Sequence, residues 1–272
     1  MTIIGISDGG IGEPVLRKED RRLLTGEGNY TDDISLPNQA HAMIVRSPHA
    51  HARIASMDVD RALEAPGVLA VFTGADLEAD GIGSIPDQAN MPGLVDVAMD
   101  NTDGSPKLVS PIPLLATDKT RFVGNAVAVV IAESNFAASD GMELVDVTYE
   151  PLPTVLATNQ AATADAPLVW DELASNTMVD AVFGDSEATD KAFETAEFVI
   201  DIATQINRVT GVMLEPRSAL CAYDAADERY TFYCGGDNSV RLKRDIAIVM
   251  GVAEERIHVI ANDIGGNFGT RN

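Results

Sequence analysis

Apolar and polar residues alternate along much of the first half of the chain, and this pattern predicts β-strands. In residues 40–59 (AHAMIVRSPHAHARIASMDV) the alternation predicts a strand on either side of Ser47-Pro48. A short helix that ends at Pro66-Gly67 is expected next, followed by a buried strand over Val68–Phe72. The order strand, helix, strand indicates a mixed α/β fold.

The same kind of pattern continues after a stretch rich in Gly, Pro, Asp and Asn over Glu78–Pro113, which we interpret as a long surface excursion. The continuous apolar run Ala126–Ala132 predicts a second buried strand. A helix over Asn135–Leu144 and an alternating strand over 145–153 (VDVTYEPLP) complete a compact α/β unit near Pro153.

The second half of the chain carries a different set of elements. Residues 186–206 (SEATDKAFETAEFVIDIATQI) predict a capped helix that turns into a strand. Residues 218–236 predict a hairpin closed on Asp224–Glu228. An amphipathic helix that ends at Gly251 and a strand over Ile257–Ala261 follow.

These patterns divide the chain into two domains of a mixed α/β (α+β) protein. We expect a flexible arm over residues 1–15, an α/β domain over 16–155, an Ala/Thr/Asp-rich linker over 156–178 and a second α/β domain over 179–272. One helix and a few strands cannot easily bury a core of their own, so we expect the second domain to be incomplete.

Composition narrows the classes of partner. The 272 residues include 19 Lys and Arg against 42 Asp and Glu, which gives a net charge of -23 and argues against nucleic acid and membrane as partners. Cys221 and Cys234 are the only cysteines, and we expect buried free thiols, with a disulfide as the alternative. The chain start lacks the basic region of a signal peptide and no run reaches the length of a membrane span, so we expect a cytoplasmic protein.

Three stretches carry candidate chemistry. Residues 261–272 (ANDIGGNFGTRN) predict a glycine loop after a strand, whose exposed backbone N–H groups suit an anionic or oxo-bearing ligand; an ordinary glycine turn is the alternative. His49 and His51 lie two residues apart on a predicted strand, and we interpret them as surface polar residues rather than as a shared metal site. Glu215 is expected either to orient a ligand or to pair with Arg217. The residues alone do not define a reaction.

Taken in order, several stretches resemble the large subunits of molybdenum hydroxylases, the family of xanthine dehydrogenases, aldehyde oxidoreductases and aerobic carbon monoxide dehydrogenases. RKEDRRLLTGEGNYTDDISLP, VRSPHAHARI, APGVLAVFTGADL, RFVGNAVAVVIAES and VDVTYEPLP are similar to the hammerhead-type N-terminal domain. EPRSALCAYD, RLKRDIAIVMGV and RIHVIANDIGGNFGTRN are similar to the start of the molybdenum-cofactor-binding domain.

The resemblance implies an enzyme component that oxidises an aldehyde, an N-heterocycle or a similar small substrate with oxygen derived from water. It implies a molybdenum-pterin cofactor in the cytosine dinucleotide form, with [2Fe-2S] clusters in a small partner subunit and FAD in a medium one. Gly265, Gly266, Phe268 and Gly269 match the family's GGxFG segment, whose backbone approaches the molybdenum oxo ligands and the pterin. Arg271 stands where the family has a basic residue, and a structural salt bridge accounts for it equally well.

Two positions depart from the family pattern. Asp237 stands where many members have a glutamine that donates a hydrogen bond to a molybdenum oxygen, and an ionised carboxylate can only accept. Asn272 stands where purine-oxidising members have a substrate-orienting glutamate, which argues against a purine substrate. The resemblance places the general-base glutamate outside this chain, so no catalytic residue and no metal ligand is assigned within it.

We therefore expect the N-terminal part of a large subunit that is active only with the missing remainder and the electron-transfer subunits. The alternative is a non-catalytic truncated fragment that acts as an interaction module.

Overall fold

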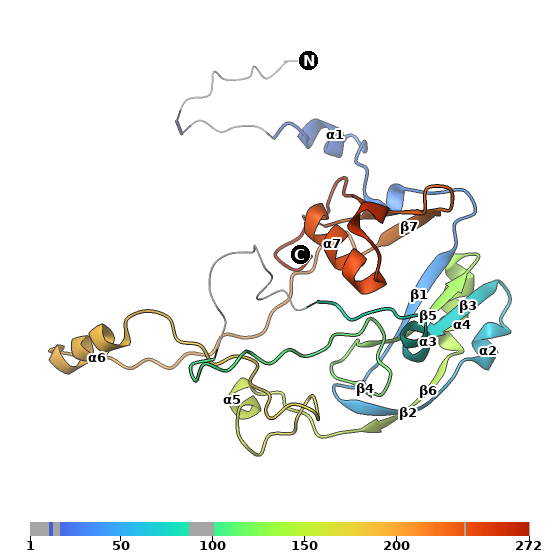
Figure 1. Cartoon of the computed structure of the whole chain (residues 1–272). Coiled ribbons are helices and arrows are strands. Elements are labelled where there is room, and N and C mark those ends of the chain that lie inside the picture. The colour runs from blue at the N-terminus through green and yellow to red at the C-terminus, as the bar shows by residue number, and fades with distance from the viewer. Residues whose placement is uncertain (1–10, 13–16, 87–100, 237, 272) are drawn as a thin grey trace. The chain divides into compact units, whose positions relative to one another are not determined.

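The computed structural model describes residues 11–12, 17–86, 101–236 and 238–271 (Figure 1). The chain forms two compact units. The larger unit contains Pro37–Val209 and Arg244–Glu254, and the smaller unit contains the described residues of Met1–Leu36, Thr210–Lys243 and Glu255–Asn272. The arm expected over residues 1–15 lies almost wholly outside the described residues, and the expected domain boundaries stay predictions.

Two three-stranded antiparallel sheets form the larger unit. The first has the order β1-β5-β3, and the second has the order β4-β2-β6. Their strands are β1 (His41–Arg46), β2 (Ala52–Asp58), β3 (Val68–Thr73), β4 (Lys119–Thr120), β5 (Ala126–Ala132) and β6 (Asp146–Pro151).

Three short helices of the larger unit connect these strands, and a fourth follows β6. They are α2 (Asp60–Leu63), α3 (Gly74–Ala79), α4 (Asn135–Glu143) and α5 (Thr158–Ala161). Ser134 caps α4, because its side chain accepts a hydrogen bond from the backbone N–H of Ala137.

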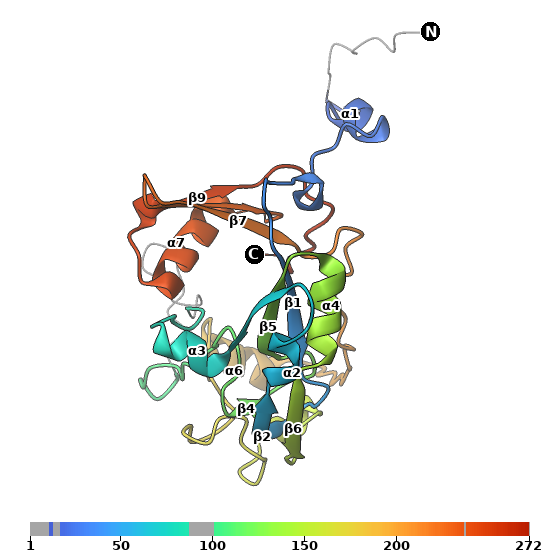
Figure 2. The same ribbon diagram turned by 90° about the vertical axis from the view of Figure 1, so that its right-hand side faces the viewer.

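The core of the larger unit lies around the central strand β5. Four of its residues are fully buried: Val127, Ala128, Val130 and Ala132. Helix α4 lies along β1 and β5 (Figure 2) and contributes the fully buried Ala138. Gly141 permits this close approach, because a Cβ there would lie 2.7 Å from a methyl group of Val68. The buried strand Ala126–Ala132, the helix that follows it and the alternating strand after that helix are confirmed. The strand expected over Val68–Phe72 also forms, but the expectation that it is buried was wrong, since Leu69 is 56% and Phe72 38% exposed.

The smaller unit contains a mixed sheet of order β7-β8-β9. β7 (Ala219–Asp224) and β8 (Arg229–Cys234) form the expected antiparallel hairpin, and β8 pairs in parallel with β9 (Ile257–Ile260). A parallel pair needs a crossover connection, and the chain between β8 and β9 forms α7 (Ser239–Met250), which begins in the smaller unit and continues into the larger, and the 3-10 helix η2 (Glu254–Arg256). The N-terminal elements of this unit are α1 (Asp20–Leu24) and the 3-10 helix η1 (Thr31–Asp33).

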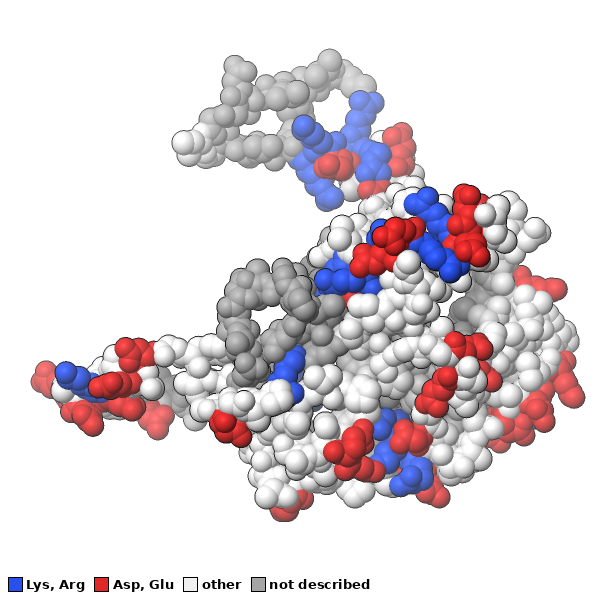
Figure 3. Space-filling view, viewed as in Figure 1, with Lys and Arg blue, Asp and Glu red and all other residues white. Residues whose placement is uncertain are grey.

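Helix α6 (Ser186–Thr195) is exposed along its whole length. The side chain of Asp185 caps it by accepting a hydrogen bond from the N–H of Ala188 at 2.8 Å. Figure 3 shows the acidic side chains of α6 at the surface, with one basic side chain among them. The strand expected directly after this helix is absent: residues 198–209 form no helix, turn or strand. A strand requires a hydrogen-bonded neighbour, and no other described segment supplies one.

Both cysteines are free thiols, as expected, but Cys221 is exposed and Cys234 is only half-buried. They lie on neighbouring strands out of register, since Cys221 faces Phe232 and Cys234 faces Ala219. The expectation of two buried thiols was wrong, because Cys221 lies on the edge strand β7 and Cys234 is the last residue of β8.

Candidate functional site

The glycine loop lies in the smaller unit and begins directly after β9. Three residues have positive φ angles: Gly266 (115°), Phe268 (53°) and Gly269 (72°). The N–H of Thr270 donates to the carbonyl of Asn267 at 3.0 Å and closes a turn. The backbone N–H groups of Gly266, Phe268 and Gly269 have no hydrogen-bond partner among the described residues. The loop therefore presents three backbone donors within four positions.

The side chain of Glu215 holds the loop from one side. Its Oε2 accepts a hydrogen bond from the N–H of Gly265 at 2.7 Å and one from Arg271 at 2.6 Å. A second guanidinium nitrogen of Arg271 donates to the backbone carbonyl of Glu215. Both side chains are buried, with exposed fractions of 9% for Glu215 and 3% for Arg271. The pair thus ties both ends of the glycine loop to one carboxylate.

Opposing effects set the charge of Glu215. Burial by itself raises the pKa of this carboxyl, but the hydrogen bond from Gly265 and the hydrogen bond and charge of Arg271 together outweigh burial. The resulting pKa of Glu215 lies below its usual value, so the carboxylate is ionised near neutral pH. The partner suggested by sequence proximity, Arg217, instead donates to the carbonyl of Thr270.

Asp263 holds the start of the loop. Arg22 donates two hydrogen bonds to its carboxylate, at 2.5 and 2.7 Å, and the N–H of Asn29 donates a third at 2.7 Å. The N–H of Asp263 donates in return to the carbonyl of Asn29 at 3.1 Å. The hydrogen bonds from Arg22 and then from Asn29 hold the pKa of Asp263 well below its usual range. This anchor was not predicted from the sequence, because no local pattern links residues 241 positions apart.

Two glycines of the loop are required by its internal packing. A Cβ at Gly265 would lie 2.3 Å from the Cβ of Glu215, too close for any side chain. A Cβ at Gly266 would lie 3.0 Å from side-chain atoms of Met213 and of Phe268. The ring of Phe268 itself is 75% exposed. Asp237 and Asn272 lie outside the described residues, and the roles expected for them stay predictions.

The histidines of the larger unit have a different environment from the one expected. His49 and His51 lie in the turn between β1 and β2 rather than on a strand. His51 is only 8% exposed and its Nδ1 lies 2.9 Å from the carbonyl oxygen of Pro153, while the ring of His49 packs 5.0 Å from that of Tyr149. The surface assignment of His51 was wrong, because the start of β2 is covered by the chain that follows β6.

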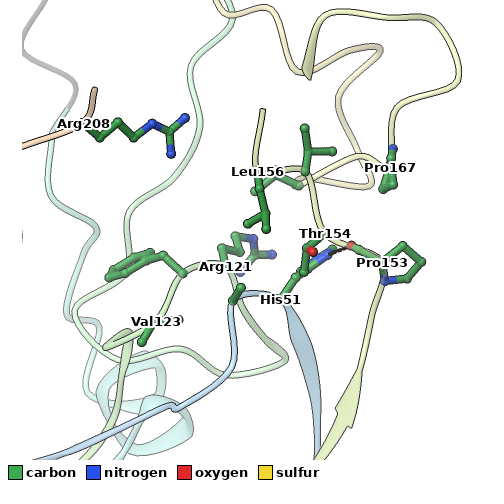
Figure 4. Close-up of a pocket in the computed structure, with 12 residues that line it drawn as sticks. His51, Arg121, Val123, Pro153, Thr154, Leu156, Pro167 and Arg208 are labelled. Atoms are coloured by element: carbon green, nitrogen blue, oxygen red, sulfur yellow. Dashed lines mark hydrogen bonds between the residues drawn. The ribbon is translucent and has the colours of Figure 1, made fainter. Parts of the chain in front are cut away.

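A cavity of ≈ 250 Å³ adjoins His51 in the larger unit (Figure 4). Arg121 lines it and stacks 3.5 Å from the ring centre of Trp170. The Nε2 of His51 and the Nε of Arg121 are enclosed and have no hydrogen-bond partner among the described residues. These two nitrogen atoms are enclosed by protein and do not face the cavity. We therefore assign no ligand to it. In the described part of the chain, no group of three or more His, Cys, Asp or Glu could hold a metal ion.

Comparison with known proteins relates these features to two domain families. Residues 25–153 match the family described as "Aldehyde oxidase and xanthine dehydrogenase, a/b hammerhead domain". Residues 169–272, which include the glycine loop, match the family described as "Molybdopterin cofactor-binding domain". Within the described ranges, no helix is long and apolar enough to cross a membrane.

Individual relatives agree with this assignment. The chain is 34% identical to the carbon monoxide dehydrogenase large chain of Afipia carboxidovorans, over 96% of this chain and 32% of that one. It is 36% identical to the nicotine 6-hydroxylase large subunit of Paenarthrobacter nicotinovorans, over 96% of this chain and 30% of that one. The solved structure of quinoline 2-oxidoreductase from Pseudomonas putida 86 superposes with a TM-score of 0.78 at 32% identity, over 96% of this chain and 31% of that one.

The chain thus spans about a third of the length of these relatives. The two matched domains follow one another in the chain, and the glycine loop with its two carboxylate anchors lies within the second. The chain belongs to the family of molybdenum hydroxylase large subunits that includes xanthine dehydrogenases and carbon monoxide dehydrogenases.

Proposed function

We propose that this chain forms the N-terminal part of a large subunit that hydroxylates or oxidises a small molecule with oxygen derived from water. Relatives named for carbon monoxide, nicotine and quinoline support a small-molecule substrate, of which we favour an aldehyde or an N-heterocycle. The activity requires the remainder of the large subunit together with an iron–sulfur subunit carrying [2Fe-2S] clusters and a flavin subunit carrying FAD.

The observation that carries this proposal is the set of unpartnered N–H groups at Gly266, Phe268 and Gly269. Unpaired backbone N–H groups in a tight turn with left-handed residues, such as Phe268 and Gly269, suit an anion or an oxo group. Gly265 plays a different part, because its N–H is already taken by Glu215. We propose that Gly266, Phe268 and Gly269 face the molybdenum-pterin cofactor and that Gly265 fixes the loop.

The donor set of the loop fits the proposed cofactor. When bound, a molybdenum-pterin group, which we propose to be the cytosine dinucleotide form, supplies two-electron oxidation chemistry that protein side chains lack. The contribution of this chain is to hold preorganised donors in place, since fixed dipoles stabilise charge without reorganising. The free thiols of Cys221 and Cys234 support a reducing compartment, and we propose the cytoplasm.

The test uses the tagged chain purified from its own cells with all associated subunits. We expect about one molybdenum atom per large subunit by elemental analysis, together with iron, FAD and a cytosine nucleotide released on denaturation. In the same assembly, Gly266→Val should lower the molybdenum content severely, because a branched side chain meets Met213 and Phe268 and distorts the donor surface.

Gly184→Val is the matched control. Gly184 also has a large positive φ, 103°, but lies outside the loop with nothing within 4 Å of a built Cβ. Both variants therefore carry similar backbone strain. An assembly without molybdenum, or equal molybdenum contents in the two variants, would contradict the proposed role of the loop.

A further inference from the structure

The segment that follows α6, residues 197–208 (EFVIDIATQINR), has the pattern of an amphipathic strand. Large apolar side chains stand at every second position except one: Phe198, Ile200, Ile202 and Ile206. Successive side chains of an extended chain point to opposite faces, so these four lie on one face. The intervening positions are mostly polar and include Asp201 and Gln205. We call this stretch the unpaired segment (Figure 1).

Nothing among the described residues covers the apolar face of the unpaired segment. The exposed fractions are 81% for Phe198, 82% for Ile200, 75% for Ile202 and 93% for Ile206. Single exposed apolar residues are common on protein surfaces, but a regular row of four large ones is the mark of an interaction surface. The pattern is strict enough to define which face of the segment would be buried.

The backbone of the unpaired segment is equally without partners. No backbone hydrogen bond joins residues 197–208 to any other described residue. An extended chain with a free row of N–H and C=O groups is a template for pairing with another strand. The free backbone groups and the row of apolar side chains therefore fit the same partner: a β-strand at the edge of a sheet that packs on a hydrophobic core.

The relatives indicate what that occupant is. The fold of this chain superposes on the carbon monoxide dehydrogenase structure over 94% of its residues with a TM-score of 0.78, yet it covers only 31% of that chain. About two thirds of the large subunit therefore have no counterpart in this chain. A strand-like segment that has no partner within this chain is expected to pair with a strand in that remaining part. We propose that the unpaired segment enters, as a β-strand, a sheet formed by the part of a molybdenum hydroxylase large subunit that this chain does not match.

This inference rests on the proposed function, because it takes the remainder of the large subunit as the partner. It holds whether that remainder is joined to this chain or is a separate polypeptide. The apolar face of Phe198, Ile200, Ile202 and Ile206 packs on the core of the remainder, and the backbone extends its sheet. Exposed in the isolated 272-residue chain, the segment becomes protected only in the assembly.

Hydrogen exchange measures this directly. In the isolated chain, the amides of residues 197–208 should exchange at unprotected rates, and in the purified assembly they should slow by about a hundredfold or more. A photo-crosslinking residue placed at position 202 should attach to a peptide from the unmatched two thirds of the large subunit. A cross-link to a second copy of this chain or to the flavin or iron–sulfur subunit, or unprotected amides in the assembly, would overturn the inference.

A matched pair of variants tests the face. Ile202→Glu and Gln205→Glu each add one negative charge to an exposed position of the segment, but on opposite faces. We expect Ile202→Glu to reduce the protection of residues 197–208 in the assembly by about tenfold or more, since it places a charge in an apolar interface. Gln205→Glu should change it less than twofold. Neither variant should alter the unfolding of the isolated chain, and equal effects of the two on protection would contradict the assigned face.

Molybdenum analysis of the same samples separates this inference from the proposed function. An assembly that protects the segment but lacks molybdenum would leave the strand pairing intact and remove the hydroxylase function. An assembly that contains molybdenum but leaves the segment unprotected would support the hydroxylase function and contradict the strand pairing.

Discussion

Arg22 and Asp263 lie 241 positions apart in the chain and are joined by two hydrogen bonds of 2.5 and 2.7 Å. This two-point contact fixes the start of the glycine loop to the helix α1 near the other end of the chain. A planar guanidinium matches a carboxylate in this way, whereas a Lys ammonium offers a single point charge. The conformation of the loop therefore depends on a residue far from it in sequence.

Arg22→Lys tests that dependence. The variant keeps the charge but loses the paired geometry, so we expect hydrogen exchange of residues 261–266 to accelerate by about tenfold. Arg21→Lys is the control, since Arg21 lies on the same helix and is exposed. Unchanged exchange in Arg22→Lys would mean that Asn29 alone holds Asp263.

The buried pair Glu215–Arg271 is expected to contribute more to stability than any surface pair in this unit. Arg271→Ala leaves the carboxylate of Glu215 enclosed without its cation, and breaking a buried pair in this way costs about 3 kcal/mol. Arg217→Ala removes only an exposed donor to the carbonyl of Thr270 and should cost about 1 kcal/mol. Urea unfolding of the two variants gives both values, and equal losses would show that burial of the pair has no energetic consequence.

Acid should weaken the hydrogen bonds that hold the glycine loop. The pKa values of Asp263 and Glu215 are both lowered in the folded chain from reference values of 3.8 and 4.5. Carboxyl groups with lowered pKa values stabilise the fold fully above those reference values and lose this contribution as pH falls further, through the folded pKa. We expect exchange of residues 261–271 to be constant from pH 7 to about pH 5, after correction for the intrinsic rate, and to rise below about pH 4.

Two variants assign that acid response. Asp263→Asn and Glu215→Gln remove one titrating group each, so each should flatten part of the rise below about pH 4. A rise of the same size in both variants and in the unaltered chain would place the titrating group elsewhere.

Trp170 offers a fluorescence signal for the segment that follows β6, because it is the only tryptophan. Arg121 stacks on its ring at 3.5 Å, and the neighbouring Asp171 pairs with the buried Lys119. Arg121→Lys should shift the emission of Trp170 and weaken docking of this segment by about 1 kcal/mol, measured as a lower urea midpoint of the fluorescence change. Arg61→Lys is the control, because Arg61 is exposed on helix α2. The same midpoint in both variants would argue against the stacking contact.

The elements that the sequence predicts well are those determined by local pattern. The run Ala126–Ala132 is apolar at every position and predicts a buried strand, and four of the seven residues of β5 are buried. The hairpin of β7 and β8 follows from alternation around a polar turn. In both cases the neighbours that satisfy the element are present in the described chain.

The features that the sequence did not predict depend on distant partners. The sequence neighbours of His51 are typical of a surface residue, but in the structure the chain around Pro153 buries its side chain. Glu215 takes its cation from Arg271, 56 positions away, rather than from the adjacent Arg217. Residues 198–209 carry the pattern of a strand but do not form one, since pattern determines which face is apolar and only a partner completes the backbone pairing. Of the candidate site, the glycines and a structural salt bridge of Arg271 were among the predictions, whereas the pairing of that arginine with Glu215 and the anchor at Asp263 were not.

The contact between Arg22 and Asp263 has a consequence for the order of folding. Residues 37–209 of the larger unit lie between the two partners in the chain, so synthesis delivers the whole of that stretch before Asp263 exists. Domains fold as units while a chain is being made, and contacts of long sequence separation form late. The two sheets of the larger unit are therefore expected to form first, while Arg22 on α1 still lacks its partner Asp263. The glycine loop is expected to acquire its donor geometry in one of the last steps of folding.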